Sequence, residues 1–172
     1  SGWVTTGPKA KRFEDDFSAF LGDPGLHSLA VNSATAGLHL ALEALGIGPG
    51  DEVITTTHTF TATAEVVRYL GADVVLVDID PATFTIDPAL IAAAITPRTK
   101  AILPVHLYGR ACAMGGILEL AHETGAFVIE DAAQAIGARL HGKAAGLFGD
   151  AGCFSFYPTK NLGGAGDGGL VA

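Results

Sequence analysis

The sequence predicts an α/β domain with a doubly wound, mostly parallel sheet and helices on both faces. Short apolar runs alternate with segments of helical periodicity along the chain. The central runs, VVLV at 74–77, AILPV at 101–105 and FVIE at 127–130, are almost continuously hydrophobic. Such runs are typical of parallel strands covered on both faces, and their alternation with helices implies right-handed crossovers. A length of 172 residues favours a single domain.

The pattern predicts each element in turn. Strands are expected at 28–31, 52–56, 73–77, 101–105, 127–130, 152–156 and 168–172. Helices are expected at 35–45, 61–70, 88–95 and 114–123. In the first helix, Leu38, Leu42 and Leu45 keep the three- and four-residue spacing of one buried face. Gly46 and Gly125 stand where two of the helices should end, because glycine readily adopts the left-handed cap conformation.

Composition and charge exclude several classes of protein. The formal net charge is −8, which is the opposite of the positive surface that a nucleic-acid-binding domain needs. Lys9, Lys11 and Arg12 lie close together, but this is more typical of the solvated start of a helix than of a binding patch. No apolar run approaches the ~18 residues that span a bilayer. Cys112 and Cys153 form no disulfide framework or zinc motif, so we expect no metal and a cytoplasmic location.

The two ends of the sequence indicate a piece of a longer chain. The sequence starts with WVTTGP at 3–8, which reads as the middle of a segment, and it stops within an apolar run at 170–172. Charged residues make up 16% of the chain, against about 25% in an average soluble domain. We therefore expect residues 1–172 to form one domain that is truncated at both ends.

A segment of small and hydroxyl residues joins the first strand to the first helix. Its sequence, NSATAG at 32–37, places Ser33 and Thr35 at the start of an amphipathic helix. The free N–H groups and the positive dipole end of a helix make a ready site for a phosphate group. An ordinary helix cap by Ser33 or Thr35 explains the same pattern, so this segment alone leaves both interpretations open.

A carboxylate ends one of the central strands. Asp131 follows the run VIE, and open α/β sheets place their ligands at the carboxyl ends of their strands. Gln134 lies three residues later and would face the same ligand if a helical turn begins here. The alternative is that Asp131 only caps a short helix.

A single lysine follows another predicted strand, in the segment SFYPTKNLGG at 155–164. Lys160 stands in apolar surroundings with few charges. Burial disfavours the ammonium form of lysine, which makes the amine more nucleophilic and suited to Schiff-base chemistry. A surface lysine in a loop is the alternative that this segment alone would favour.

Taken together, the three segments match the needs of pyridoxal 5'-phosphate. Its phosphate needs N–H and hydroxyl donors, its ring nitrogen needs an anion, and its aldehyde needs an amine. A helix start, Asp131 and Lys160 at the strand ends of one sheet would supply all three.

Several long motifs then identify a family. NSATAGLHLALEALGIGPGDEVI, HTFTATAEVVRYLGA, VIEDAAQAIGA and FSFYPTKNLG follow one another in this order, with PVHLYG between the second and third. They closely resemble the DegT/DnrJ/StrS family of nucleotide-sugar aminotransferases, and the similarity covers essentially the whole chain. The resemblance implies the aspartate-aminotransferase architecture called fold type I. The chain would then be most of the large cofactor-binding domain, without the C-terminal small domain.

The resemblance assigns catalytic roles to two residues. Lys160 would form the Schiff base with the cofactor and would move the proton once substrate displaces it. Asp131 would pair with the pyridinium nitrogen. Gln134 would sit by the phenolic oxygen of the ring, and Phe60 in THTFTAT would stack on the ring. His106 in PVHLYG has no assigned role, and we expect it to be structural.

The same resemblance assigns the phosphate site to Thr35, Ala36 and Ser155. It implies transfer of an amino group from an amino acid, with glutamate the expected donor, to a nucleotide-linked keto-sugar. Such enzymes serve the biosynthesis of amino sugars, cell-surface polysaccharides or antibiotics. It also implies a homodimer with a composite site, so we expect the isolated chain to be weakly active or inactive. A binding or regulatory protein without turnover, and another fold-type-I enzyme such as a lyase, are the alternatives.

Overall fold

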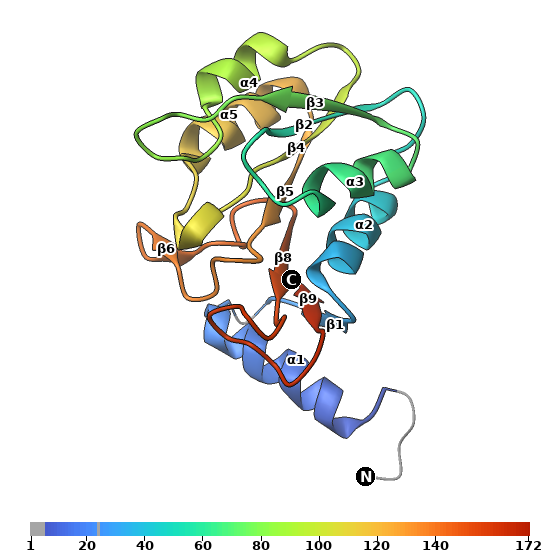
Figure 1. Ribbon diagram of the computed structural model, residues 1–172, viewed down its shortest axis with the longest axis vertical. Coiled ribbons are helices and arrows are strands. Elements are labelled where there is room, and N and C mark those ends of the chain that lie inside the picture. Colours follow the sequence, from blue (N-terminus) through green and yellow to red (C-terminus); the bar gives the residue numbers. More distant parts are fainter. Residues whose placement is uncertain (1–5, 24) are drawn as a thin grey trace.

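The computed structural model describes residues 6–23 and 25–172, and its centre is a seven-stranded sheet in the order β1-β9-β8-β5-β4-β2-β3 (Figure 1). The segment at 3–8, which we expected to continue an earlier part of a longer chain, lies partly outside the described residues. The strands are β1 (Leu29–Val31), β2 (Glu52–Thr56), β3 (Asp73–Val77), β4 (Thr99–Leu103), β5 (Phe127–Asp131), β8 (Ala151–Ser155) and β9 (Gly169–Val171). A separate two-stranded hairpin consists of β6 (Arg139–Leu140) and β7 (Lys143–Ala144).

The sheet is mostly parallel, as predicted. β3, β2, β4, β5 and β8 pair with their neighbours in parallel. β9 is the exception, because it runs antiparallel to both β8 and β1. The register between β5 and β8 sets Asp131 opposite Cys153, so the carboxyl ends of these two central strands lie at the same edge of the sheet.

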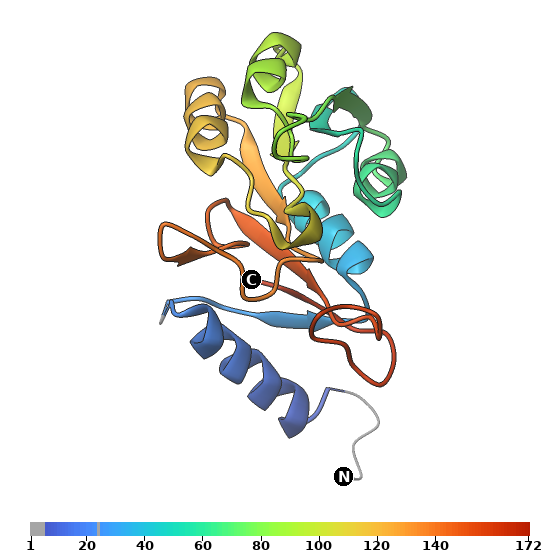
Figure 2. The ribbon, with the colours of Figure 1, turned by 60° about the vertical axis from the view of Figure 1, so that its left-hand side comes forward.

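Helices cover both faces of the sheet (Figure 2). They are α1 (Pro8–Leu21), α2 (Ala34–Ala44), α3 (Ala62–Tyr69), α4 (Pro88–Ala94) and α5 (Met114–Thr124), with a short 3-10 turn, η1 (Leu107–Gly109). Leu38 of α2 packs in one core cluster with Val53 of β2, whereas Ile117 of α5 packs in another with Ile54. Val53 and Ile54 are successive strand residues and point to opposite faces. The doubly wound prediction is therefore confirmed.

The sequence did not predict α1, although the basic residues at 9–12 do mark its start. Phe13 and Phe17 lie one helical turn apart on its inner side, and both rings pack edge-on against Phe156. Phe17 makes a similar contact with Phe154 of β8. The apolar stripe of α1 therefore covers the end of the sheet formed by β8 and β9.

The fourth strand lies two residues earlier than predicted, at Thr99–Leu103 instead of 101–105. Pro104 ends it because proline has no N–H to donate, although its carbonyl accepts from the Asp131 N–H at 2.9 Å. Val105 makes a single bridge to Asp131.

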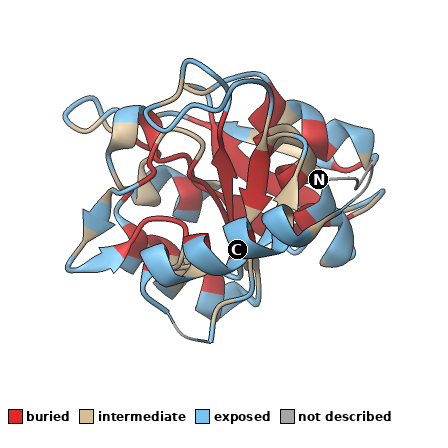
Figure 3. Ribbon diagram, turned by 90° about the horizontal axis from the view of Figure 1, so that it is seen from below, coloured by how far each residue is buried: buried red, intermediate tan, exposed pale blue. Residues whose placement is uncertain are grey.

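The strands at the centre are buried while the outer faces of the helices are exposed, as Figure 3 shows. Within residues 6–23 and 25–172, no helix combines the length and apolar character that a membrane-spanning segment requires.

Candidate active site

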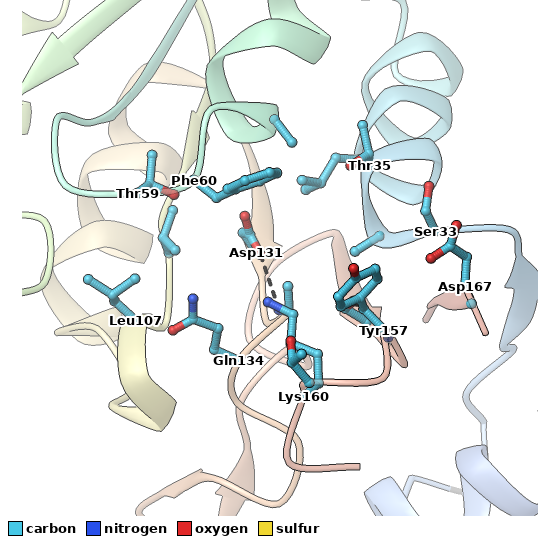
Figure 4. A pocket seen from close by; sticks show the side chains of 18 residues that line it. Ser33, Thr35, Thr59, Phe60, Leu107, Asp131, Gln134, Tyr157, Lys160 and Asp167 are labelled. Atoms are coloured by element: carbon cyan, nitrogen blue, oxygen red, sulfur yellow. Dashed lines mark hydrogen bonds between the residues drawn. The ribbon is translucent and has the colours of Figure 1, made fainter. Parts of the chain in front are cut away.

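A cavity of about 450 Å³ lies at the carboxyl ends of β5 and β8 (Figure 4). The start of α2, the loop before α3, the segments after β4 and β5, and the turn after β8 all contribute to its lining. Of the seven residues predicted to bind a cofactor, six line it: Thr35, Phe60, Asp131, Gln134, Ser155 and Lys160. The seventh, Ala36, is not among the lining residues, and its N–H donates to Ser33 Oγ at 3.1 Å.

The start of α2 combines a cap with free donors. Ser33 is the cap: its backbone is extended and its hydroxyl oxygen accepts from Ala36. The Thr35 hydroxyl therefore does not serve as the cap, and it lies on the cavity wall. In an α-helix the first N–H groups, here those of Ala34 and Thr35, have no partner within the helix. This end of α2 thus presents N–H donors and the positive end of the helix dipole to the cavity.

A glycine brings β9 against this helix start. A Cβ atom on Gly169 would lie 2.3 Å from the Ser33 carbonyl carbon. Only glycine therefore permits this close approach. The approach of β9 to the start of α2 places Asp167 and Gly168, which line the cavity, beside Ser33.

Asp131 is buried, with 6% of its surface exposed, at the end of β5. Its Oδ2 accepts from the Thr63 hydroxyl at 2.9 Å, and its Oδ1 accepts from the Ala133 N–H at 3.1 Å. Burial raises the pKa of Asp131 above its usual value, while these two hydrogen bonds and the positive charge of Lys160 act to lower that pKa. The segment that follows forms turns instead of the helical turn we considered, and Asp131 and Gln134 nevertheless line the same cavity.

Gln134 has a defined orientation. Its Oε1 accepts from the Tyr108 N–H at 2.9 Å, so the acceptor end of the amide is engaged and the Nε2 donors are available to the cavity. The Tyr108 backbone has a φ of 55°, in the left-handed region that a bulky residue rarely adopts.

Lys160 is half-buried in a turn whose backbone is fixed by a bond from its N–H to the Tyr157 carbonyl at 2.9 Å. The next residue, Asn161, donates to the Ile136 carbonyl at 2.8 Å. This bond joins the lysine turn to the turn that follows Asp131. Lys160 is thus held within the cavity wall, and its positive charge is close enough to act on Asp131.

Two further residues complete the predicted set. Phe60 is 71% exposed, although it lines the cavity, and Figure 4 shows its ring on the side opposite Lys160. An exposed aromatic ring at a cavity suits stacking on a flat ligand. Ser155 is buried, and its Oγ accepts from the Tyr157 N–H at 3.3 Å. Its hydroxyl proton remains available to a ligand.

These residues fit pyridoxal phosphate: an amine, a buried carboxylate, a flat apolar surface and a helix start meet in one cavity. Comparison with known proteins agrees. The model of the DegT/DnrJ/EryC1/StrS aminotransferase family matches residues 1–172. The chain belongs to this family.

Similar proteins of this family include enzymes of known structure. The chain is 55% identical to a UDP-N-acetyl-3-dehydro-alpha-D-glucosamine 3-aminotransferase from Acidithiobacillus ferrooxidans, covering 91% of this chain and 46% of that one. The structure of this chain matches that of DesV from S. venezuelae, which was solved with a ketimine intermediate. The TM-score is 0.96 and the identity 48%, and the match covers 100% of this chain and 46% of DesV. The structure also matches the PLP-form of a putative sugar aminotransferase from Streptococcus pneumoniae, with a TM-score of 0.93 and 36% identity over 99% and 47%.

The chain therefore spans less than half the length of these aminotransferases. The predicted fold type I and the family resemblance are both confirmed. The structural neighbours also bear out the expected cofactor, since they include aminotransferases in PLP and PMP forms.

Several residues at this cavity were not predicted from the sequence. Thr63 donates to Asp131, and Thr59 lines the cavity beside it. Both lie within three residues of Phe60 in the HTFTAT motif. No spacing rule, however, pairs this motif with Asp131, which lies 68 residues after Thr63. His106 lies outside the cavity lining and is fully buried, where its Nε2 bonds to Glu130 Oε2 at 2.7 Å.

No group of three or more His, Cys, Asp or Glu residues that could hold a metal ion occurs within residues 6–23 and 25–172.

Proposed function

We propose that the protein containing this chain transfers an amino group from an amino acid to a nucleotide-linked keto-sugar, with pyridoxal phosphate bound in the cavity at β5 and β8. The single observation that carries the proposal is the meeting of Lys160, Asp131 and the start of α2 in one cavity of a chain that belongs to an aminotransferase family. Glutamate is the donor that the family resemblance suggests. The name of the A. ferrooxidans relative, with its UDP-linked 3-dehydro sugar, supports a substrate of this class.

The bound cofactor supplies an electron sink that stabilises negative charge at the reacting carbon. Lys160 would provide the amine that holds the cofactor aldehyde, and it would be the group that moves the proton at the reacting carbon. Asp131 would hold the proton on the ring nitrogen through a carboxylate oxygen. A buried carboxylate suits this role because low dielectric strengthens its attraction to the pyridinium.

The remaining residues bind and orient the ring. Gln134 would donate its Nε2–H to the phenolic oxygen, since its Oε1 is held by Tyr108. Phe60 would stack on the ring and exclude water from one face. Thr35 and Ser155 would hold the phosphate together with the N–H donors at the start of α2, where Ala36 supports the Ser33 cap.

A borohydride experiment tests the proposal. The full-length protein is loaded with pyridoxal phosphate, reduced with borohydride and mapped by peptide mass. The adduct is expected on Lys160 and should vanish in Lys160→Arg but persist in Lys143→Arg, which changes an exposed lysine. An adduct elsewhere, or none, would refute the assignment of Lys160.

A second experiment separates turnover from simple cofactor binding. Glutamate is added to the loaded full-length protein, and the visible absorbance of the bound cofactor is followed. Conversion to the amine form supports the aminotransferase. Persistence of the original spectrum with every amino acid tried would favour a binding or regulatory protein instead.

We also propose that residues 1–172 form a single cofactor-binding domain and that the protein is a cytoplasmic homodimer whose active site is completed by the partner. Phe60 and Tyr108, which are 71% and 74% exposed beside the cavity, support a covering surface at this place. The molecular mass of the full-length protein in solution tests the homodimer. The activity of mixtures of Lys160→Arg and wild-type subunits tests whether the two subunits share a site. A monomeric active enzyme would contradict the composite site.

A further inference from the structure

Two threonine hydroxyls form a chain that ends on Asp131. Thr63, in the first turn of α3, is completely buried, and its Oγ1 lies 2.9 Å from Asp131 Oδ2. Thr59 Oγ1 lies 2.8 Å from Thr63 Oγ1. Thr59 itself lines the cavity. The chain therefore runs from the cavity wall through the protein interior to the carboxylate.

The chemistry of the groups fixes the direction of these hydrogen bonds. An ionised carboxylate can only accept, so Thr63 must donate its single hydroxyl proton to Asp131. Thr63 then has only acceptor capacity left for Thr59, and Thr59 must be the donor. If Asp131 were protonated on Oδ2 and donated that proton to Thr63, the Thr63 hydroxyl would accept instead, and its own proton would then be free for Thr59. The direction of the Asp131–Thr63 bond is thus coupled to the charge of Asp131.

We propose that Thr63 is a positioning residue that keeps Asp131 ionised and fixes the orientation of its carboxylate, and that Thr59 supports Thr63 by donating to its oxygen. This inference rests on the proposed function, in which the Asp131 carboxylate holds the proton of the cofactor ring nitrogen. Neither threonine needs to touch the ring nitrogen for this role.

Burial explains why Asp131 needs such help. A carboxyl group in the protein interior favours its neutral form, and burial is the main cause of the raised pKa of Asp131. The titratable groups around it are Lys160 in the cavity, His106 and Cys112 after β4, Glu130 on the same strand and Cys153 on β8. None of these five donates a side-chain hydrogen bond to the carboxylate.

The donors that do contact the carboxylate are Thr63 and the Ala133 N–H. Only a proline at position 133 would remove the Ala133 N–H, and its ring would also constrain the backbone of this turn, so Thr63 is the contact that a conservative mutation can test. A hydrogen bond to a charged group that is lost in the interior corresponds to a shift of about one to two pH units in the pKa of that group.

The test measures Asp131 directly in the cofactor-free, full-length protein. Carbon-13 NMR of labelled aspartate carboxyls, with Asp131→Asn to assign the signal, gives its titration. Thr63→Val keeps the shape of the side chain and removes the hydroxyl, and should raise the pKa of Asp131 by about one to two pH units. Thr63→Ser keeps the hydroxyl and should restore the wild-type value.

Thr55→Val is the matched control. Thr55 is also completely buried, but its hydroxyl donates to the Leu103 carbonyl, so its replacement should leave the pKa of Asp131 unchanged. Thr59→Val lies at a partly exposed position and should raise it by a smaller amount than Thr63→Val. If Thr63→Val does not fold, Thr59→Val and Thr63→Ser still decide the question.

Cofactor binding gives an independent readout. The Kd for pyridoxal phosphate is measured against pH, and affinity should decline where Asp131 takes up a proton. In Thr63→Val this decline should move to higher pH by the same amount as the NMR titration. An unchanged Asp131 titration in both Thr63→Val and Thr59→Val would overturn the inference. A missing borohydride adduct at Lys160 would instead overturn the proposed function, so the two failures are distinguishable.

Discussion

Replacing Glu130 with glutamine should destabilise the protein, because four donors converge on its carboxylate. Glu130 is completely buried at the penultimate position of β5. One oxygen accepts from the Gly146 N–H at 2.8 Å and from His106 Nε2 at 2.7 Å. The other accepts from the N–H groups of Phe148 and Gly149. A glutamine amide would turn an NH₂ group toward one of these two pairs of donors.

His106 cannot adapt to the change. Its Nδ1 accepts from the Cys112 N–H at 3.1 Å, so its ring proton must stay on Nε2 and point at residue 130. The substitution therefore weakens two charge-assisted bonds and leaves two donors facing an NH₂ group. At about 1–3 kcal/mol for each buried group that is left unsatisfied, we expect a loss of roughly 3 kcal/mol in the free energy of unfolding. If this domain unfolds as a cooperative unit of its own, that corresponds to about 6–12 °C in its melting temperature.

Thermal unfolding of the full-length protein, followed by circular dichroism, measures this loss. Amide hydrogen exchange should show faster exchange at Gly146 and Gly149 than in the wild type. Glu119→Gln, on the exposed face of α5, is the matched control and should stay within about 0.5 kcal/mol of the wild type. Glu130→Gln with wild-type stability and wild-type exchange at these glycines would refute the reasoning.

Three further predictions follow from the same interior. Asp131→Asn should stabilise the cofactor-free protein at neutral pH, because burial raises the pKa of Asp131 and its ionisation therefore opposes folding. The gain in stability should shrink as the pH falls through this raised pKa, which thermal melts at several pH values measure. A variant that is less stable than the wild type at neutral pH would contradict this prediction. Cys112, whose pKa burial raises to about 12, and the equally buried Cys153 should resist thiol reagents until the protein unfolds; rapid labelling of the native protein would count against their burial. Gly146→Ala should lower the free energy of unfolding by about 2–4 kcal/mol, because φ is 92° and the new Cβ would lie 2.3 Å from the Phe154 ring. Gly46→Ala also has a positive φ but open space around it, so it should cost only about 1 kcal/mol. Equal losses in denaturant unfolding would show that crowding is not the cause.

The fold could be predicted from sequence where local pattern carries the information. The runs at 101–105 and 127–130 are hydrophobic on both faces, as expected of covered parallel strands. The same expectation was wrong for the run at 74–77, because β3 is the edge strand of the sheet and leaves Leu76 54% exposed. The helix α1 was missed because its apolar stripe consists of Phe13, Phe17 and Leu21 among charged residues. The surface that stripe covers includes Phe154 and Phe156, more than 130 residues away in the chain, and no local pattern reports such a pairing.

The candidate site was predictable for a topological reason. Parallel strands bring their carboxyl ends to one edge, so residues that follow β5 and β8 meet the residues at the start of α2. Asp131, Lys160 and Ser155 can be selected from the sequence on this ground. Thr63 cannot, because its importance depends on a hydrogen bond to Asp131, 68 residues away. Glu130 cannot either, because its importance depends in part on a hydrogen bond to His106, 24 residues away.

Glu130 and Asp131 are adjacent carboxylates at the end of one strand, and their hydrogen bonds distinguish their tasks. Successive strand residues point to opposite faces, so each meets a different set of donors. A carboxylate has about four acceptor positions. Glu130 uses four, with three backbone N–H groups and His106, and has none left for a ligand. Asp131 uses two, with Thr63 and Ala133, and faces the cavity with the rest. The first carboxylate is therefore committed to holding the strand end in place, and the second is the one that can still accept a proton donor from a bound ring.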